Sequence, residues 1–114
     1  MADISVDVTI KDGQGSYSSK SSQVQPDGTI TINPGENDTI TFVPASGQSW
    51  TFLNPGIVIQ ALTPGIDDVS IVSQSSASVV IEDNNSSSIV PSDYEYTLQT
   101  TAGNLDPRII NKGR

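Results

Sequence analysis

The sequence predicts an all-β domain, an immunoglobulin-like antiparallel β-sandwich of about eight short strands with very little helix. Three observations predict it: alternation of apolar and polar residues, turn residues at short intervals, and a composition rich in β-branched residues and serine. No stretch has the 3.6-residue apolar period of a helix. Because 114 residues fit one domain with one core, we predict a single domain over residues 1–114.

The N-terminal third of the chain predicts one long strand and one hairpin. Residues 4–10 alternate between apolar and polar side chains, which is typical of a strand with one buried face. Residues 12–22 are rich in Gly and Ser and read as a connection, in which Tyr17 is the only bulky residue. The turn Pro26-Asp27-Gly28 then joins the two halves of a hairpin over residues 23–32.

Turns that place Pro before Gly divide the middle of the chain, at Asn33-Pro34-Gly35, Asn54-Pro55-Gly56 and Thr63-Pro64-Gly65. A type II turn prefers this pair, because Pro presets one φ and Gly accepts the positive one. Strands are expected over residues 39–43, 49–53, 57–62, 69–73, 78–81 and 94–98. The aromatic residues Phe42, Trp50 and Phe52 are interpreted as core residues.

The charge of the chain and its missing residue types exclude several functions. A formal charge of -8 disfavours a nucleic-acid partner, and the five basic residues are scattered. The short basic stretch at the C-terminus is interpreted as a solvated tail. Without Cys and His, the chain has no Ser-His or Cys-His nucleophile pair, no disulfide and no typical transition-metal ligand. We therefore predict no cofactor, and any chemistry falls to carboxylates and hydroxyls.

The N-terminal residues lack the basic and apolar regions of a signal peptide, and no segment has the apolar length of a membrane span. We therefore expect a cytoplasmic protein without a membrane partner. Two oxygen-rich segments, Asp67-Asp68 and Glu82-Asp83-Asn84-Asn85, are of the type that binds calcium. Neither has the spaced ligands of a calcium loop, so ordinary solvent-exposed loops are the favoured interpretation and no metal site is predicted.

The linkage Asp106-Pro107 has chemistry of its own. The proline nitrogen belongs to a tertiary amide, and once protonated it is a better leaving group. The Asp106 carboxyl is able to close a five-membered ring onto its own main-chain carbonyl, or to activate a water. Either route needs a proton delivered to nitrogen, from a carboxyl with a raised pKa or from a Tyr hydroxyl. The alternative is an intact bond, with Pro107 starting an edge strand over residues 108–111.

Two runs, Asp93-Tyr94-Glu95-Tyr96-Thr97-Leu98 and Asn104-Leu105-Asp106-Pro107-Arg108-Ile109-Ile110-Asn111, resemble the C-terminal signature of the bacterial DP-EP family. The resemblance extends more loosely over the whole chain, through the hairpin turn at residues 26–28 and the Asn-Pro-Gly turn after it. It implies a small β-sandwich classed with the aspartic-type peptidases, a hydrolase that cleaves its own Asp106-Pro107 bond. Residues 107–114 would then stay bound as a strand, making the chain's own C-terminal peptide its partner.

The same resemblance implies an assisting carboxylate, Asp27, and a tyrosine, Tyr17. Asp27 would share a proton with Asp106, and Tyr17 would donate to the developing oxyanion. The alternative interpretation of Asp27 is an ordinary turn residue that caps its own backbone. Relatives carry a Lys near the segment that here reads Asn85-Ser86-Ser87-Ser88, and this chain lacks it. The competing function is a non-enzymatic interaction or structural module, which pairs with itself as a homo-oligomer, or with a partner protein, through an exposed edge strand.

Overall fold

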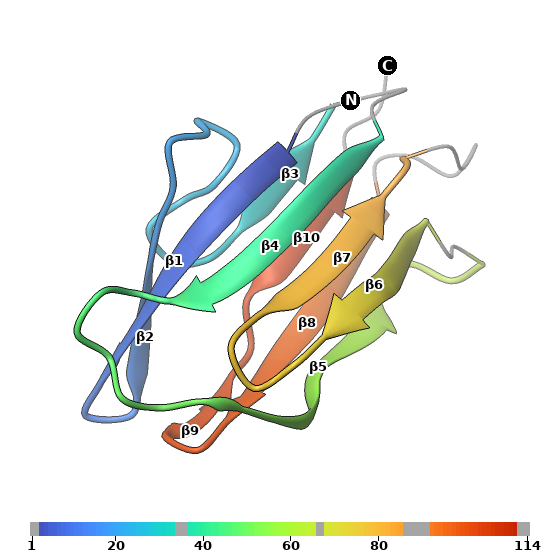
Figure 1. The fold of residues 1–114 in the computed structure, drawn as a ribbon. Helices are drawn as coiled ribbons and strands as arrows, with labels where there is room; N and C mark the ends of the chain where they lie inside the picture. Colours follow the sequence, from blue (N-terminus) through green and yellow to red (C-terminus); the bar gives the residue numbers. More distant parts are fainter. Residues whose placement is uncertain (1–2, 34–36, 66–67, 86–91, 112–114) are drawn as a thin grey trace.

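The structure is a computed structural model that describes residues 3–33, 37–65, 68–85 and 92–111. Ten strands lie in these ranges: β1 (Asp3–Lys11), β2 (Gln14–Ser18), β3 (Ile30–Ile32), β4 (Asp38–Pro44), β5 (Phe52–Ala61), β6 (Val69–Gln74), β7 (Val79–Asp83), β8 (Ser92–Thr100), β9 (Gly103–Leu105) and β10 (Arg108–Asn111). They stack as two layers (Figure 1). The described residues contain no helix. The predicted all-β sandwich is therefore confirmed.

One sheet has the strand order β2-β1-β4-β7-β6, and the other has the order β3-β10-β8-β5, with β9 paired to β8. Most pairings are antiparallel, as predicted, but β1 runs parallel to β4 and β3 runs parallel to β10. The purely antiparallel prediction was wrong at these two pairs, because both join strands that are far apart in the sequence rather than hairpin neighbours. The immunoglobulin-like part of the prediction stays a prediction.

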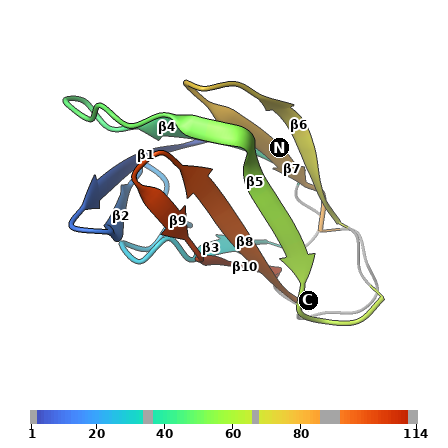
Figure 2. The same cartoon turned by 90° about the horizontal axis from the view of Figure 1, so that it is seen from below.

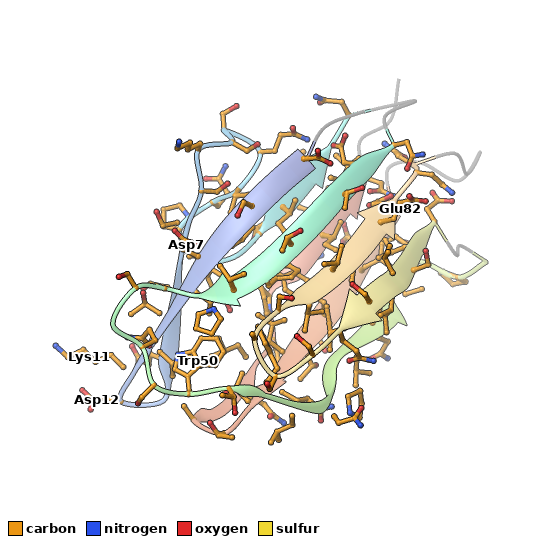
Figure 3. The ribbon with its side chains drawn as sticks, in the orientation of Figure 1. Asp7, Lys11, Asp12, Trp50 and Glu82 are labelled. Atoms are coloured by element: carbon orange, nitrogen blue, oxygen red, sulfur yellow. The ribbon has the colours of Figure 1, made fainter. Side chains whose placement is uncertain are left out.

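Alternation along the strands builds the core between the two layers. In β1 the side chains of Ile4, Val6 and Val8 are buried while their polar neighbours are exposed. The predicted core aromatics are also buried, namely Phe42, Trp50 and Phe52. Trp50 packs edge-on against Phe52, with 5.2 Å between ring centroids, and Figure 3 shows it near one end of the sandwich.

Several elements differ from the prediction, and the strand expected over residues 49–53 begins only at Phe52. The expected Gly- and Ser-rich connection contains β2, which pairs antiparallel with β1 in a hairpin. The expected turn at Asn54-Pro55-Gly56 lies inside β5, which passes through it with a register irregularity between Phe52 and Ile57. The expected edge strand after Pro107 is β10, which lies between β3 and β8 inside its sheet.

The predicted turn at Pro26-Asp27-Gly28 is present, although residues 23–25 before it form an isolated bridge rather than a strand. Gly28 N–H donates to the Gln25 carbonyl at 2.9 Å, with Pro26 at the position that a type I turn favours. An antiparallel bridge between Val24 and Ile30 follows. The Asn33-Pro34-Gly35 turn lies partly outside the described residues, as do Asp67, the segment 86–88 and the basic tail. Among the described residues, no helix is long and apolar enough to cross a membrane.

Candidate functional site

Asp106 and Pro107 form the two-residue connection between β9 and β10. Asp106 is exposed and Pro107 is buried. The chain is fixed to β8 on both sides of the bond, because Leu105 pairs with Leu98 and Tyr96 N–H donates to the Pro107 carbonyl at 3.0 Å. The bond between Asp106 and Pro107 is therefore held in a short span between two anchored residues.

The carboxyl of Asp106 has a defined partner on β8. Thr97 Oγ1 donates a hydrogen bond to Asp106 Oδ1 at 2.7 Å. Alternation along β8 directs Tyr96 into the core and leaves Thr97 half-buried on the outer side. Thr97 was not among the predicted site residues. The only signal in the sequence was the alternation along residues 94–98, which places Thr97 on the outer face of the strand.

Gly28 brings the hairpin turn against the Asp106-Pro107 connection. A Cβ added at Gly28 would lie 2.7 Å from Pro107 Cβ and 2.7 Å from Tyr17 Cε1. The turn therefore packs directly on Pro107 and on the ring of Tyr17. The buried Tyr96 hydroxyl fixes the position of the turn, because it donates a hydrogen bond to the Gly28 carbonyl at 2.6 Å.

Tyr17 reaches the site from β2. Figure 2 shows β2 of one sheet beside β9 of the other, and a Cβ added at Gly15 would lie 2.6 Å from Leu105 Cδ1 and 3.2 Å from the Tyr17 hydroxyl. Burial raises the pKa of Tyr17 well above its ordinary value, and the negative charges of Asp106 and Asp27 raise that pKa further. Tyr17 is therefore a neutral phenol at physiological pH, suited to donating a hydrogen bond rather than releasing its proton.

Asp27 stands at the rim of the site and is exposed. Its Oδ1 accepts a hydrogen bond from Thr29 N–H at 2.9 Å, and this bond lowers the pKa of the Asp27 carboxyl. A carboxyl that shares a proton with Asp106 would have a raised pKa instead. The capping bond is the one that the turn interpretation predicts, so Asp27 contributes a negative charge to the site and is not its proton donor.

The sequence-predicted residues Tyr17, Asp27, Asp106 and Pro107 thus gather around Gly28, from β2, the hairpin turn and the β9–β10 connection. A surface groove of about 510 Å³ lies elsewhere, along the start of β1 and the residues after β2. None of these four residues lines that groove. The chemical groups that this site brings together are the Asp106 carboxyl, the Asp106-Pro107 amide and the Tyr17 hydroxyl.

No protein family matches the chain, and no curated protein matches it significantly. The assignment to the DP-EP family therefore stays a prediction that rests on the two C-terminal runs and the early turns.

Proposed function

We propose that the protein is a self-cleaving aspartic-type endopeptidase that hydrolyses its own Asp106-Pro107 bond once per chain. The observation that carries the proposal is the Thr97 hydrogen bond to the Asp106 carboxyl, in a connection whose two ends are both fixed to β8. An intramolecular attack gains most from such fixed geometry, because the entropy of bringing the reacting groups together is already lost on folding.

The reaction proceeds through attack of the Asp106 carboxylate on its own main-chain carbonyl carbon, which forms a five-membered ring and an oxyanion. The bond from that carbon to the Pro107 nitrogen then breaks, and the nitrogen takes a proton from solvent. Water opens the resulting cyclic anhydride, leaving two carboxyl groups on Asp106 and a free imino group on Pro107. The balance is one water consumed for each bond cut.

The residues around the Asp106-Pro107 bond have different roles in the proposed reaction. Thr97 orients the attacking carboxyl, and the Tyr17 phenol, whose raised pKa keeps it protonated, donates to the oxyanion. Neither Tyr17 nor the ionised Asp27 supplies the proton to nitrogen, which makes the reaction dependent on protons from solvent. Cleavage is therefore expected to be faster at mildly acidic than at neutral pH.

Intact-mass spectrometry over several days at mildly acidic pH tests the proposal. The expected result is a pair of fragments that end at Asp106 and begin at Pro107, heavier together than the chain by one water. The variant Asp106→Ala should remain uncut, and Asp93→Ala, which removes a carboxyl from β8, should cleave like the wild type. A single uncut mass in the native protein under all these conditions would disprove the proposal.

Two controls distinguish assisted cleavage from the simple acid lability of an Asp-Pro bond. The folded protein should be cut faster than the same protein unfolded in urea at the same pH, because only the fold supplies the positioning contacts. Tyr17→Phe should slow the folded protein's reaction about a hundredfold, the loss typical of one oxyanion donor. Equal rates in the folded and unfolded protein would contradict an active site.

The alternative function is a non-enzymatic module that pairs with a second copy of the chain. The observation that favours it is a group of exposed apolar side chains on β5, β6 and the residue after β5: Leu53, Val58, Leu62, Ile71 and Val72. Both strands are edges in their sheet orders. Sedimentation equilibrium of an uncut chain should then show a dimer that Val58→Lys makes monomeric.

A further inference from the structure

The core of the sandwich is polar at one end. Inward-facing positions of four strands carry apolar side chains along most of their length and then end on polar ones: Asp38 in β4, Asp83 in β7, Ser92 in β8 and Asn111 in β10. All four are fully or almost fully buried. Figure 3 labels Glu82, the neighbour of Asp83 on β7, at the end of the sandwich opposite to Trp50.

These polar side chains come from both sheets and meet across the core. Asp38 pairs with Asp83 in one sheet, and Ser92 pairs with Asn111 in the other. Asn111 Nδ2 donates across the sheets to Asp83 Oδ1 at 3.0 Å, with a longer contact of 3.4 Å to Asp68 Oδ2. The five residues therefore form one cluster, which we call the polar end of the core.

Three oxygen atoms of the polar end have no hydrogen-bond partner among the described residues: Asp83 Oδ2, Ser92 Oγ and Asn111 Oδ1. Buried polar atoms are nearly always paired, so each of these needs an explanation. The Asp83 and Asn111 atoms are acceptors only, and both Nδ2 hydrogens of Asn111 are directed to carboxylates. Each of these two acceptor atoms therefore lacks a hydrogen-bond donor or a bound cation.

The residues around the polar end are held in place by hydrogen bonds of their own. Asn85 Nδ2 donates to the carbonyls of Ile32 and Asn33 at 3.1 and 3.0 Å, and Asn85 N–H donates to Asp83 Oδ1 at 2.9 Å. Gln23 Nε2 donates to Asp38 Oδ2 at 3.1 Å. The oxygen atoms are therefore fixed by the fold rather than carried on a free loop.

We propose that the polar end of the core is a Ca²⁺ site, with Asp83, Ser92 and Asn111 as ligands and with Asp38 and Asp68 supplying further carboxylate charge. Every donor is an oxygen, of carboxylate, amide or hydroxyl type, which is the set that a hard cation takes. Ca²⁺ accepts irregular geometry and mixed ligands more readily than Mg²⁺ does. Among the described residues, no three Asp, Glu, His or Cys side chains are placed to hold a metal ion together. The proposed site therefore depends on the amide and hydroxyl oxygens beside Asp83.

Thermal unfolding at pH 7.5 in EDTA and in millimolar CaCl₂ tests the site. Because an ion that binds only the folded chain stabilises it, Ca²⁺ should raise the Tm by about 4 °C or more. MgCl₂ and NaCl at matched ionic strength should raise it less. The variant Asp83→Asn should lose the Ca²⁺ shift, whereas Glu82→Gln, which removes the same charge one residue away on the other side of β7, should keep it.

Calorimetric titration of the folded wild-type protein with CaCl₂ supplies a second readout, whose ion count needs no variant. One ion per chain is expected, with affinity about tenfold weaker in Ser92→Ala. A Ca²⁺ shift that is absent, or that Asp83→Asn retains, overturns the proposal. If acidification stabilises the protein while no cation does, Asp83 is a buried carboxylic acid that donates to Asn111, and the ion site is wrong. Asp106→Ala should leave the Ca²⁺ shift intact, since the cleavage site shares no residue with the polar end of the core.

Discussion

At Gly28 the backbone has a φ of 91°, and the side chains of Tyr17 and Pro107 close over the position that a Cβ would take. Both requirements favour glycine, the first through backbone sterics and the second through space. The residue has no chemistry of its own. Its absent side chain is what lets the hairpin turn lie against the Asp106-Pro107 bond.

Replacing Gly28 by Ala should therefore destabilise the protein more than backbone strain alone explains. Gly47 is the matched control, because its φ of 87° is nearly the same while nothing lies within 4 Å of an added Cβ. We expect Gly28→Ala to lower the free energy of unfolding by about 1–3 kcal/mol more than Gly47→Ala does, the usual cost of overpacking. Urea denaturation of both variants measures the difference, and equal losses would show that the contacts at Gly28 are easily relieved.

Sequence reasoning reached part of this site. Asp106-Pro107 was recognisable from the chemistry of the dipeptide, whereas Tyr17 and Asp27 came from the family resemblance alone. The structure brings all of them around Gly28 but makes Asp27 a capped, ionised turn residue. Thr97 was missed because contact between β8 and the β9–β10 connection depends on the strand pairing, which alternation alone does not specify.

Among the strands, β10 differs from the prediction in its position, because it lies inside its sheet and not at the edge. Pro107 suggested an edge strand, since proline cannot donate to a ladder. It precedes β10, however, and so removes no donor from that strand. With β3 on one side and β8 on the other, β10 is bonded along both edges. An ion pair between Arg108 and Asp93 adds a contact on the exposed side, where its contribution to stability is small.

This placement predicts that the peptide beginning at Pro107 stays bound after cleavage. Ile109 is fully buried, whereas Ile110 is half-buried on the other face of the strand. In the cleaved protein, Ile109→Ala should release the peptide on size-exclusion chromatography without denaturant, and Ile110→Ala should retain it. Removing a buried Ile side chain costs about 2–5 kcal/mol, and that loss falls entirely on the bound peptide. Retention by both variants would show that backbone hydrogen bonds alone suffice.

Two other elements show where alternation fails as a guide. β2 has glycine and serine at most positions, so its pairing with β1 depends on the tight turn between them and not on an apolar pattern. β5 contains a Pro-Gly pair that is typical of a turn, yet the strand continues through it with a register irregularity at the edge of its sheet. In both cases, pairing with a neighbouring strand determines the local structure, and a single sequence does not show that pairing.

At the scale of the whole molecule, stability should depend on pH through the polar end of the core. Burial raises the pKa of Asp83 from 3.8 to about 6, while hydrogen bonds from Asn85 and Asn111 lower it and the charges of Asp68 and Asp38 raise it further. The folded chain therefore holds this proton more tightly than the unfolded chain does. Stability falls as the pH rises from about 4 to about 6 and then levels off.

In EDTA, Asp83→Asn should be more stable than the wild type at pH 7.5 and nearly equal to it at pH 4. The amide has no charge to bury, and its nitrogen offers the donor that Asn111 Oδ1 lacks. A rise in pKa from 3.8 to about 6 corresponds to at most roughly 3 kcal/mol. Chemical denaturation at the two pH values measures the gap, and a gap independent of pH would rule out titration of Asp83.

The polar end of the core was visible in the sequence only in hindsight. Asp38 lies two residues before the buried Ile40, and Asp83 lies two residues after the buried Ile81. Because side chains two residues apart in a strand share a face, the alternation would have placed both carboxylates in the core. Polar residues at strand ends are usually assigned to loops instead. The segment Glu82-Asp83-Asn84-Asn85 was therefore interpreted as a solvent-exposed loop, which is wrong for the buried Asp83 and Asn85. The contact between β7 and β10 could not be foreseen from one sequence.

The parallel pairing of β3 with β10 also has a consequence for the order of folding. Ile30 is made early, and its partner Ile109 emerges only after most of the chain has been synthesised. Contacts of such long range form late and slow the search for the native state. The contact of Thr97 with Asp106 spans only nine residues, whereas the packing of Gly28 against Pro107 joins the two ends of the chain. The complete set of contacts around the Asp106-Pro107 bond is therefore expected to form late, and the proposed self-cleavage would start only when folding ends.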